Sequence, residues 1–209
     1  LPGSDWRVAT SLDADAQRAL QLGWGLGCYR FDRYKAGKRA AARLVADSFD
    51  AEAFDLLAAC VRVRDLVNTP TEHMGPADLE VVARELAARH GAALTVTTGE
   101  DLLAHGYPAI HAVGRASHRA PRILELSWGD ASHPHVAICG KGVCFDTGGL
   151  DLKTAVGMRN MKKDMGGAAH ALALAELVMA RKLPVRITVL VAAVENAIGP
   201  DAFRPGEVI

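Results

Sequence analysis

The chain has 209 residues, of which 50% are hydrophobic and 23% charged, with 24 basic and 24 acidic side chains. This composition is typical of a globular protein and excludes an intrinsically disordered one, and the zero net charge provides no overall attraction to nucleic acid. No apolar run approaches the ~20 residues that cross a bilayer, and no secretory signal is recognisable. Four cysteines without close pairing favour a reduced compartment. We therefore expect a cytoplasmic protein without a membrane partner.

The first third of the chain, residues 1–67, is rich in Ala, Arg and Leu and predicts helices. One helix is expected to begin at Asp13 and to be broken by the glycines at 23–27. A second covers residues 51–67, and Pro70 ends it because proline disfavours helical geometry in the residue before it. The basic stretch at 30–43 between them is interpreted as a solvated helix face or a subunit contact.

From residue 68 onward, helices alternate with short apolar runs. Helices are predicted from Pro76 to Gly91 and over 166–182. Strands are predicted at 92–98, 109–113, 121–128, 134–140 and 185–194. Runs that are apolar on both faces and separated by helices indicate an α/β fold, with a mainly parallel sheet flanked by helices and preceded by a helical linker segment.

The residues that suggest chemistry lie between 140 and 167, after a buried-type strand. Two acids, Asp146 and Asp164, stand in glycine-rich surroundings together with Lys141 and Lys153. Ligand sites of open α/β sheets lie beyond the carboxyl ends of strands. Carboxylates beside lysines either form ordinary ion pairs or hold a divalent metal while a lysine polarises a carbonyl. The residues alone leave both interpretations open.

Two segments resemble the catalytic core of the leucine (cytosol) aminopeptidase family of two-metal exopeptidases. They are Gly-Lys-Gly-Val-Cys-Phe-Asp-Thr-Gly-Gly-Leu-Asp-Leu-Lys, from Gly140, and Met-Lys-Lys-Asp-Met-Gly-Gly-Ala-Ala, from Met161. Asn68-Thr69-Pro70, Glu195-Asn196 and the segment from Arg204 to Ile209 extend the likeness. The resemblance implies that residues 68–209 are the first part of a zinc-exopeptidase-like catalytic domain whose C-terminal part is absent, and that residues 1–67 are a helical linker and the remnant of an N-terminal domain.

The resemblance also assigns roles position by position. It implies that Lys141, Asp146 and Asp164 are metal ligands, with Asp146 shared by two ions and Lys141 bound as the neutral amine. Lys153 is similar to the family's catalytic lysine, which binds substrate and stabilises the oxyanion of the tetrahedral intermediate. Met161 corresponds to a substrate-binding residue that lines the pocket for a leucine-like side chain.

Taken as a whole, the resemblance implies a metal-dependent aminopeptidase that releases N-terminal residues from peptides by two-metal activation of water. Expected cofactors are two divalent ions per subunit, Zn or Mn, with bicarbonate as a possible base, and the expected assembly is a homo-hexamer. The remaining Asp, Glu and Arg of the family site are expected beyond Ile209, so the chain is interpreted as a fragment that is inactive alone.

Simpler interpretations stand beside these roles. Lys141 with Asp146 and Lys153 with Asp151 would be surface ion pairs, Asp164 a helix cap, and Met161 part of the core. Lys162 and Lys163 are interpreted as solvated.

Two alternative functions come from other classes. A non-catalytic family member that binds nucleic acid or acts as a scaffold would use the basic stretch at 30–43, which lacks interleaved aromatic residues. A phosphate-binding α/β module would use the loop from Gly140 to Gly149, which lacks the Gly-x-x-x-x-Gly-Lys-Ser/Thr order.

Overall fold

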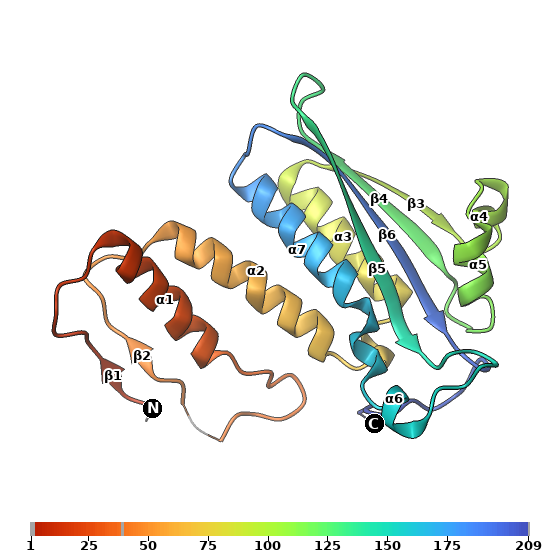
Figure 1. Cartoon of the computed structure of the whole chain (residues 1–209), viewed down its shortest axis with the longest axis horizontal. Helices are drawn as coiled ribbons and strands as arrows, with labels where there is room; N and C mark the ends of the chain where they lie inside the picture. The colour runs from red at the N-terminus through yellow and green to blue at the C-terminus, as the bar shows by residue number, and fades with distance from the viewer. Residues whose placement is uncertain (1–2, 39, 209) are drawn as a thin grey trace. The chain divides into compact units, whose positions relative to one another are not determined.

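The computed structural model describes residues 3–38 and 40–208 and divides the chain into two compact units, Leu1–Asp65 and Leu66–Ile209. Figure 1 shows the elements of both units. No helix in the described ranges is long and apolar enough to cross a membrane.

The first unit combines two helices with a short parallel strand pair. Strands β1 (Asp5–Trp6) and β2 (Arg43–Leu44) pair, and helices α1 (Ala14–Cys28) and α2 (Ala51–Asn68) follow them in the chain order β1, α1, β2, α2. Asp13 caps α1 by accepting a hydrogen bond from the Ala16 amide at 2.8 Å, as an N-cap residue should.

Helix α1 does not break at its glycines, so the predicted end at residues 23–27 is wrong. Gly25 is instead a packing contact, because a Cβ atom there would lie 2.3 Å from Leu57 Cδ2 on α2. Tertiary packing thus outweighs the low helix propensity of glycine. The basic stretch between α1 and β2 forms no helix in its described part, contrary to the interpretation as a helix face.

The second unit is a four-stranded sheet with helices packed on it. In chain order it contains η1 (Thr71–His73), α3 (Pro76–His90), β3 (Ala93–Thr98), α4 (Asp101–Ala104), α5 (Pro108–Gly114), β4 (Arg122–Trp128), β5 (His135–Asp146), α6 (Ala155–Met158), η2 (Met161–Met165), α7 (Gly166–Ala180) and β6 (Arg186–Asn196). Helices α3 and α7 contact each other and lie along one side of the sheet (Figure 1). The α/β class with flanking helices is confirmed.

The sheet has the strand order β3-β4-β6-β5, and its strand directions correct one prediction. Only β5 and β6 pair in parallel, whereas β3 with β4 and β4 with β6 are antiparallel, so the sheet in the described residues is not mainly parallel. A full helical crossover, α7, joins only β5 to β6, while a short turn reverses the chain between β4 and β5. Apolar runs reveal burial on both faces but not strand direction.

A second correction concerns residues 109–113, which were predicted as a strand and form α5. Pro108 occupies the first turn of this helix, where its fixed φ and missing N–H fit best. The other predicted strands and helices of this unit are present, and β5 extends six residues further, to Asp146.

The core lies between the sheet and helices α3 and α7. Alternate residues of β6 are buried because successive side chains point to opposite faces: Ile187, Val189, Val191 and Ala193. Leu86 of α3 and Leu172 of α7 are buried with them, and α3 and α7 both contact β6. The N-terminal turn of α7 comes so close to β5 that only glycine fits at the contact. A Cβ atom on Gly140 would lie 2.8 Å from Ala168 Cα, and one on Gly167 would lie 2.9 Å from the Lys141 amide nitrogen.

This close approach predicts that Gly140→Ala destabilises the protein. The added methyl group would push α7 away from β5, which should lower the free energy of unfolding by about 1–3 kcal/mol. Gly199→Ala is the matched control, since a Cβ atom there meets nothing within 4 Å, and it should change stability by less than ~0.5 kcal/mol. Denaturant titration followed by circular dichroism measures both, and equal effects of the two substitutions would show that the contact is not tight.

Candidate metal and catalytic site

The predicted site residues lie at the carboxyl end of β5 and in the segment that follows it. Lys141 stands in β5, Asp146 ends this strand, and Lys153 follows in the loop before α6. Met161 begins η2, and Asp164 lies three residues later in the same turn, two residues before α7 begins. Strand β5 packs against both η2 and α7, so the five residues belong to one region of the second unit.

Each carboxylate forms an ion pair with one lysine. Lys141 Nζ lies 3.0 Å from Asp164 Oδ2, and Lys153 Nζ lies 2.9 Å from Asp146 Oδ2. These are not the pairs that the simpler interpretations expected, because Lys141 contacts Asp164 and not Asp146, and Lys153 contacts Asp146 and not Asp151. Asp164 also does not cap α7 with its side chain.

The loop after β5 brings Lys153 back to Asp146. The Lys153 amide donates to the Thr147 carbonyl at 2.9 Å, and the Gly149 amide donates to Thr147 Oγ1 at 3.1 Å. Gly148 adopts a φ of +91°, and a Cβ atom there would lie 2.3 Å from the Asp151 carbonyl oxygen. Only glycine allows this tight turn, which explains why the glycine pair stands beside the acid.

Hydrogen bonds and charge set the ionisation of the Asp146–Lys153 pair. Burial raises the pKa of Asp146, but donation from Lys153, the Gly148 amide and Asn196 outweighs it and holds the pKa below the ordinary value. The hydrogen bond and charge of Asp146 raise the pKa of Lys153, and the charge of Asp164 raises it further. Lys153 is therefore an ammonium ion that both carboxylates stabilise.

The donor set suits a divalent cation but is incomplete for two. Asp164 Oδ2 is buried and receives no aligned hydrogen bond in the described structure, although the Lys141 ammonium lies 3.0 Å away. A buried carboxylate oxygen that lacks an aligned hydrogen-bond donor and faces a cationic lysine is chemically suited to hold a hard cation. Among residues 3–38 and 40–208, however, no three His, Cys, Asp or Glu side chains converge as a metal-binding group. The residues present fit part of a metal site.

Two contacts escaped the sequence interpretation. Lys162 is half-buried and donates to the Asn68 carbonyl at 2.7 Å, so it is not solvated, and burial lowers its pKa. Nothing in the sequence around Lys162 indicated that its side chain would contact a main-chain carbonyl 94 residues earlier. Asn196, at the end of β6, donates from Nδ2 to Asp146 Oδ1 at 2.7 Å. The signals for it in the sequence were its place at the end of an apolar strand and its part in the family resemblance, neither of which indicated this contact.

A buried charge network holds the chain after β6. Arg204 Nε donates to Glu195 Oε1 at 2.6 Å, and both side chains are less than a tenth exposed. Arg204 also pairs with Glu207 at 3.1 Å and with Glu72 at 3.5 Å, while Arg119 binds Glu72 at 2.5 Å. The network ties η1 to the segment that follows Asn196.

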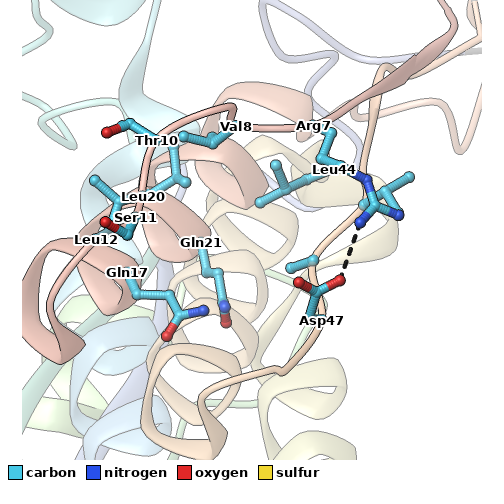
Figure 2. A pocket seen from close by; sticks show the side chains of 12 residues that line it. Arg7, Val8, Thr10, Ser11, Leu12, Gln17, Leu20, Gln21, Leu44 and Asp47 are labelled. Atoms are coloured by element: carbon cyan, nitrogen blue, oxygen red, sulfur yellow. Dashed lines mark hydrogen bonds and ion pairs between the residues drawn. The ribbon is translucent and has the colours of Figure 1, made fainter.

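A pocket in the first unit contains none of the predicted site residues. Figure 2 shows its lining, which comes from residues 7–12, α1 and residues 44–47, with Arg7 and Asp47 paired at 3.0 Å. Both members of this pair are mostly exposed, so the pocket offers no buried reactive group. It carries no catalytic argument.

The fold and the site define a class, an α/β domain whose carboxylates and lysines gather at the end of a parallel strand pair. Comparison with known families identifies it further. Residues 61–209 match the catalytic domain of the cytosol aminopeptidase family, and residues 1–47 match the M17 aminopeptidase N-terminal domain. The chain belongs to the cytosol aminopeptidase family.

Individual relatives agree with this assignment. Probable cytosol aminopeptidases of Corynebacterium efficiens and Rhodococcus opacus are each 38% identical to the chain over 97% of its length. A crystal structure of the Coxiella burnetii cytosol aminopeptidase superposes with a TM-score of 0.89 at 43% identity, covering 99% of this chain and 46% of that one. The bottromycin maturation enzyme BotP in complex with Mn superposes with a TM-score of 0.81 at 33% identity, over 96% of this chain and 45% of that one. The chain spans 43–44% of the length of the two curated relatives.

The buried network predicts that Arg204→Met is strongly destabilising. The substitution leaves Glu195 buried without its main partner, which should cost about 3–5 kcal/mol of unfolding free energy. Arg84→Met removes an arginine whose side chain is 57% exposed from its pair with Glu80 and should cost no more than ~1 kcal/mol. The double variant Arg204→Met/Glu195→Leu should recover much of the loss. Equal costs for Arg204→Met and Arg84→Met, measured by denaturant titration, would contradict a buried network.

Proposed function

We propose that this chain forms part of a metal-dependent aminopeptidase that releases N-terminal, preferably leucine-like residues from peptides. The observation that carries the proposal is the meeting of Asp146, Asp164 and two lysines at the end of β5, in a chain of the cytosol aminopeptidase family. The Mn complex of BotP, a structural neighbour, supports metal dependence.

In this proposal Lys141, Asp146 and Asp164 hold divalent metal, either Zn or Mn. When bound, the ions supply Lewis-acid activation of water and an anchor for the substrate's free amine. Lys141 must release its proton to become a ligand, since an ammonium nitrogen has no lone pair. Asp164 Oδ2, which lacks an aligned donor, is the oxygen of that residue best suited to a cation.

Lys153 acts as the catalytic cation. As an ammonium ion it can donate to the scissile carbonyl oxygen as negative charge develops there. The short loop that begins at Thr147 fixes its main chain, which limits the reorganisation needed during the reaction. Met161, half-buried at the start of η2, binds the first side chain of the substrate, where a flexible thioether adapts to leucine-like groups.

The cellular location, the assembly and the cofactors are proposed from the family resemblance. We propose a cytoplasmic enzyme that works as a homo-hexamer, with two ions per subunit and bicarbonate as a possible base. Cytosol aminopeptidase relatives support the peptide substrate and the cytoplasmic location.

The structure gives the alternative functions little support. In the basic stretch at 30–43, Arg43 pairs with Asp5 at 2.5 Å and Arg30 donates to the carbonyls of Gly27 and Tyr29, while Arg39 lies outside the described residues. In the glycine-rich loop, the Gly148 and Gly149 amides already donate to Asp146 and Thr147. These amides are not available to cradle a phosphate, which a phosphate-binding module would require.

The metal assignment predicts that the chain binds Mn²⁺ through the two carboxylates. Titration calorimetry of the 209-residue chain should show that Asp146→Asn or Asp164→Asn weakens binding by at least about tenfold, because each removes a charged ligand. Asp151→Asn, an equal charge change at an exposed position of the same loop, should leave the affinity within about threefold. If both site variants bind Mn²⁺ with the same affinity as the wild type, the metal binds elsewhere.

The catalytic assignment predicts a separation of metal binding from turnover. Three ligand groups do not complete a two-metal site, so the chain alone should not hydrolyse a leucyl peptide. Joined to the remaining sequence of the Corynebacterium efficiens relative, it should become active.

Lys153→Ala in that protein should reduce kcat by at least about 100-fold while the metal content stays unchanged, since the loss is confined to the transition state. Loss of metal in Lys153→Ala would show that the lysine is a ligand instead.

A further inference from the structure

Asn196 ends β6 directly beside Asp146. The two strands pair in parallel, and Asp146 and Asn196 are partners in the register at the last paired position. Asn196 is half-buried, and it follows Glu195, whose buried pairing with Arg204 fixes this end of β6. Asn196 therefore stands at a rigid position one strand away from a proposed metal ligand.

An irregularity in β5 brings the two side chains together. Val143 pairs with Val194 and Asp146 pairs with Asn196, so three steps along β5 match two steps along β6. The extra residue is a β-bulge, which turns the side chains that follow it. Without the bulge, the register would place Phe145 opposite Asn196, and Asp146 would point to the other face of the sheet.

Hydrogen bonds give the two oxygens of Asp146 different surroundings. Oδ1 accepts from Asn196 Nδ2 at 2.7 Å and from the Gly148 amide at 2.9 Å, whereas Oδ2 lies 2.9 Å from Lys153 Nζ. The main chain of Asn196 is held in place, because its backbone carbonyl accepts from the amide and hydroxyl of Thr147 at 3.0 and 2.8 Å. The neutral donors thus occupy one oxygen and leave the other to cations.

We propose that Asn196 is a positioning residue, whose amide holds Asp146 in a single rotamer with Oδ2 presented to the metal. The inference rests on the proposed function in so far as Asp146 is a ligand. A neutral amide suits this task, because a cationic donor would compete with the metal for the carboxylate and an acid at neutral pH would repel it. Hydrogen-bond partners of ligating carboxylates commonly contribute to metal affinity in this way.

The experiment compares Asn196→Leu with Asn160→Leu in the 209-residue chain. Asn160 is an exposed asparagine at the start of η2, so it controls for the loss of an amide and the gain of an apolar side chain. The probe is Mn²⁺ alone, with dissociation constants from calorimetry. Asn196→Leu should raise the dissociation constant about 10- to 100-fold, and Asn160→Leu should leave it within about threefold.

A metal-free spectroscopic readout separates positioning from general stability. Three-bond NMR couplings should report one χ1 rotamer for Asp146 in the wild type and averaged rotamers in Asn196→Leu, while Asp164 keeps its couplings in both. Asn196→Ala, which cannot overpack the site, should give the same result if the leucine variant does not fold.

The possible failures are distinguishable. Absence of Mn²⁺ binding both in the wild-type chain and in the chain joined to the remaining sequence of the Corynebacterium efficiens relative would contradict the proposed function. Wild-type binding with unchanged affinity and unchanged Asp146 couplings in the Asn196 variants would overturn this inference and leave the proposed function intact.

Discussion

The close approach of α7 to β5 is the constraint on which the rest of the site depends. Glycines at 140 and 167 let the helix and the strand meet with no side chain between them, so the turn that carries Asp164 lies against the strand that carries Lys141. On the other edge of β5, the parallel pairing with β6 and its bulge set the direction of Asp146. The acids, which are 18 residues apart in sequence, are therefore brought to one region by backbone contacts.

Charge balance explains how these groups coexist at neutral pH. Each carboxylate has one lysine ammonium as its partner, and Lys153 interacts with both acids. Two partly buried carboxylates without compensating charge would repel each other and resist ionisation. The same arrangement suits a cation, since a metal ion can neutralise a carboxylate in place of a lysine ammonium. In the proposed function, the ion pairs and the metal site are two states of one set of residues.

The sequence predicted the parts of the fold that depend on local pattern. Apolar periodicity predicted α3, α7 and β6, and Pro70 predicted where α2 ends. It did not predict that α1 continues through its glycines, because packing of Gly25 against Leu57 is a tertiary effect. Nor did it predict strand direction or the helix at 108–114, since short apolar runs fit either structure.

For the site, the motifs that resemble the family indicated the acids and lysines, but the pairings of Lys141 with Asp164 and of Asn196 with Asp146 depend on strand register and a bulge. Neither is visible in the order of residues.

The most direct test of a metal site at Asp146 and Asp164 is a crystal structure of the chain soaked in Mn²⁺, with an anomalous difference map recorded at the manganese edge. We expect a peak at about 2.0–2.6 Å from carboxylate oxygens of Asp146 or Asp164, the range expected for hard divalent cations, with at least one lysine displaced from its acid. A map without a peak at either acid, with both lysine–aspartate pairs unchanged, would contradict it.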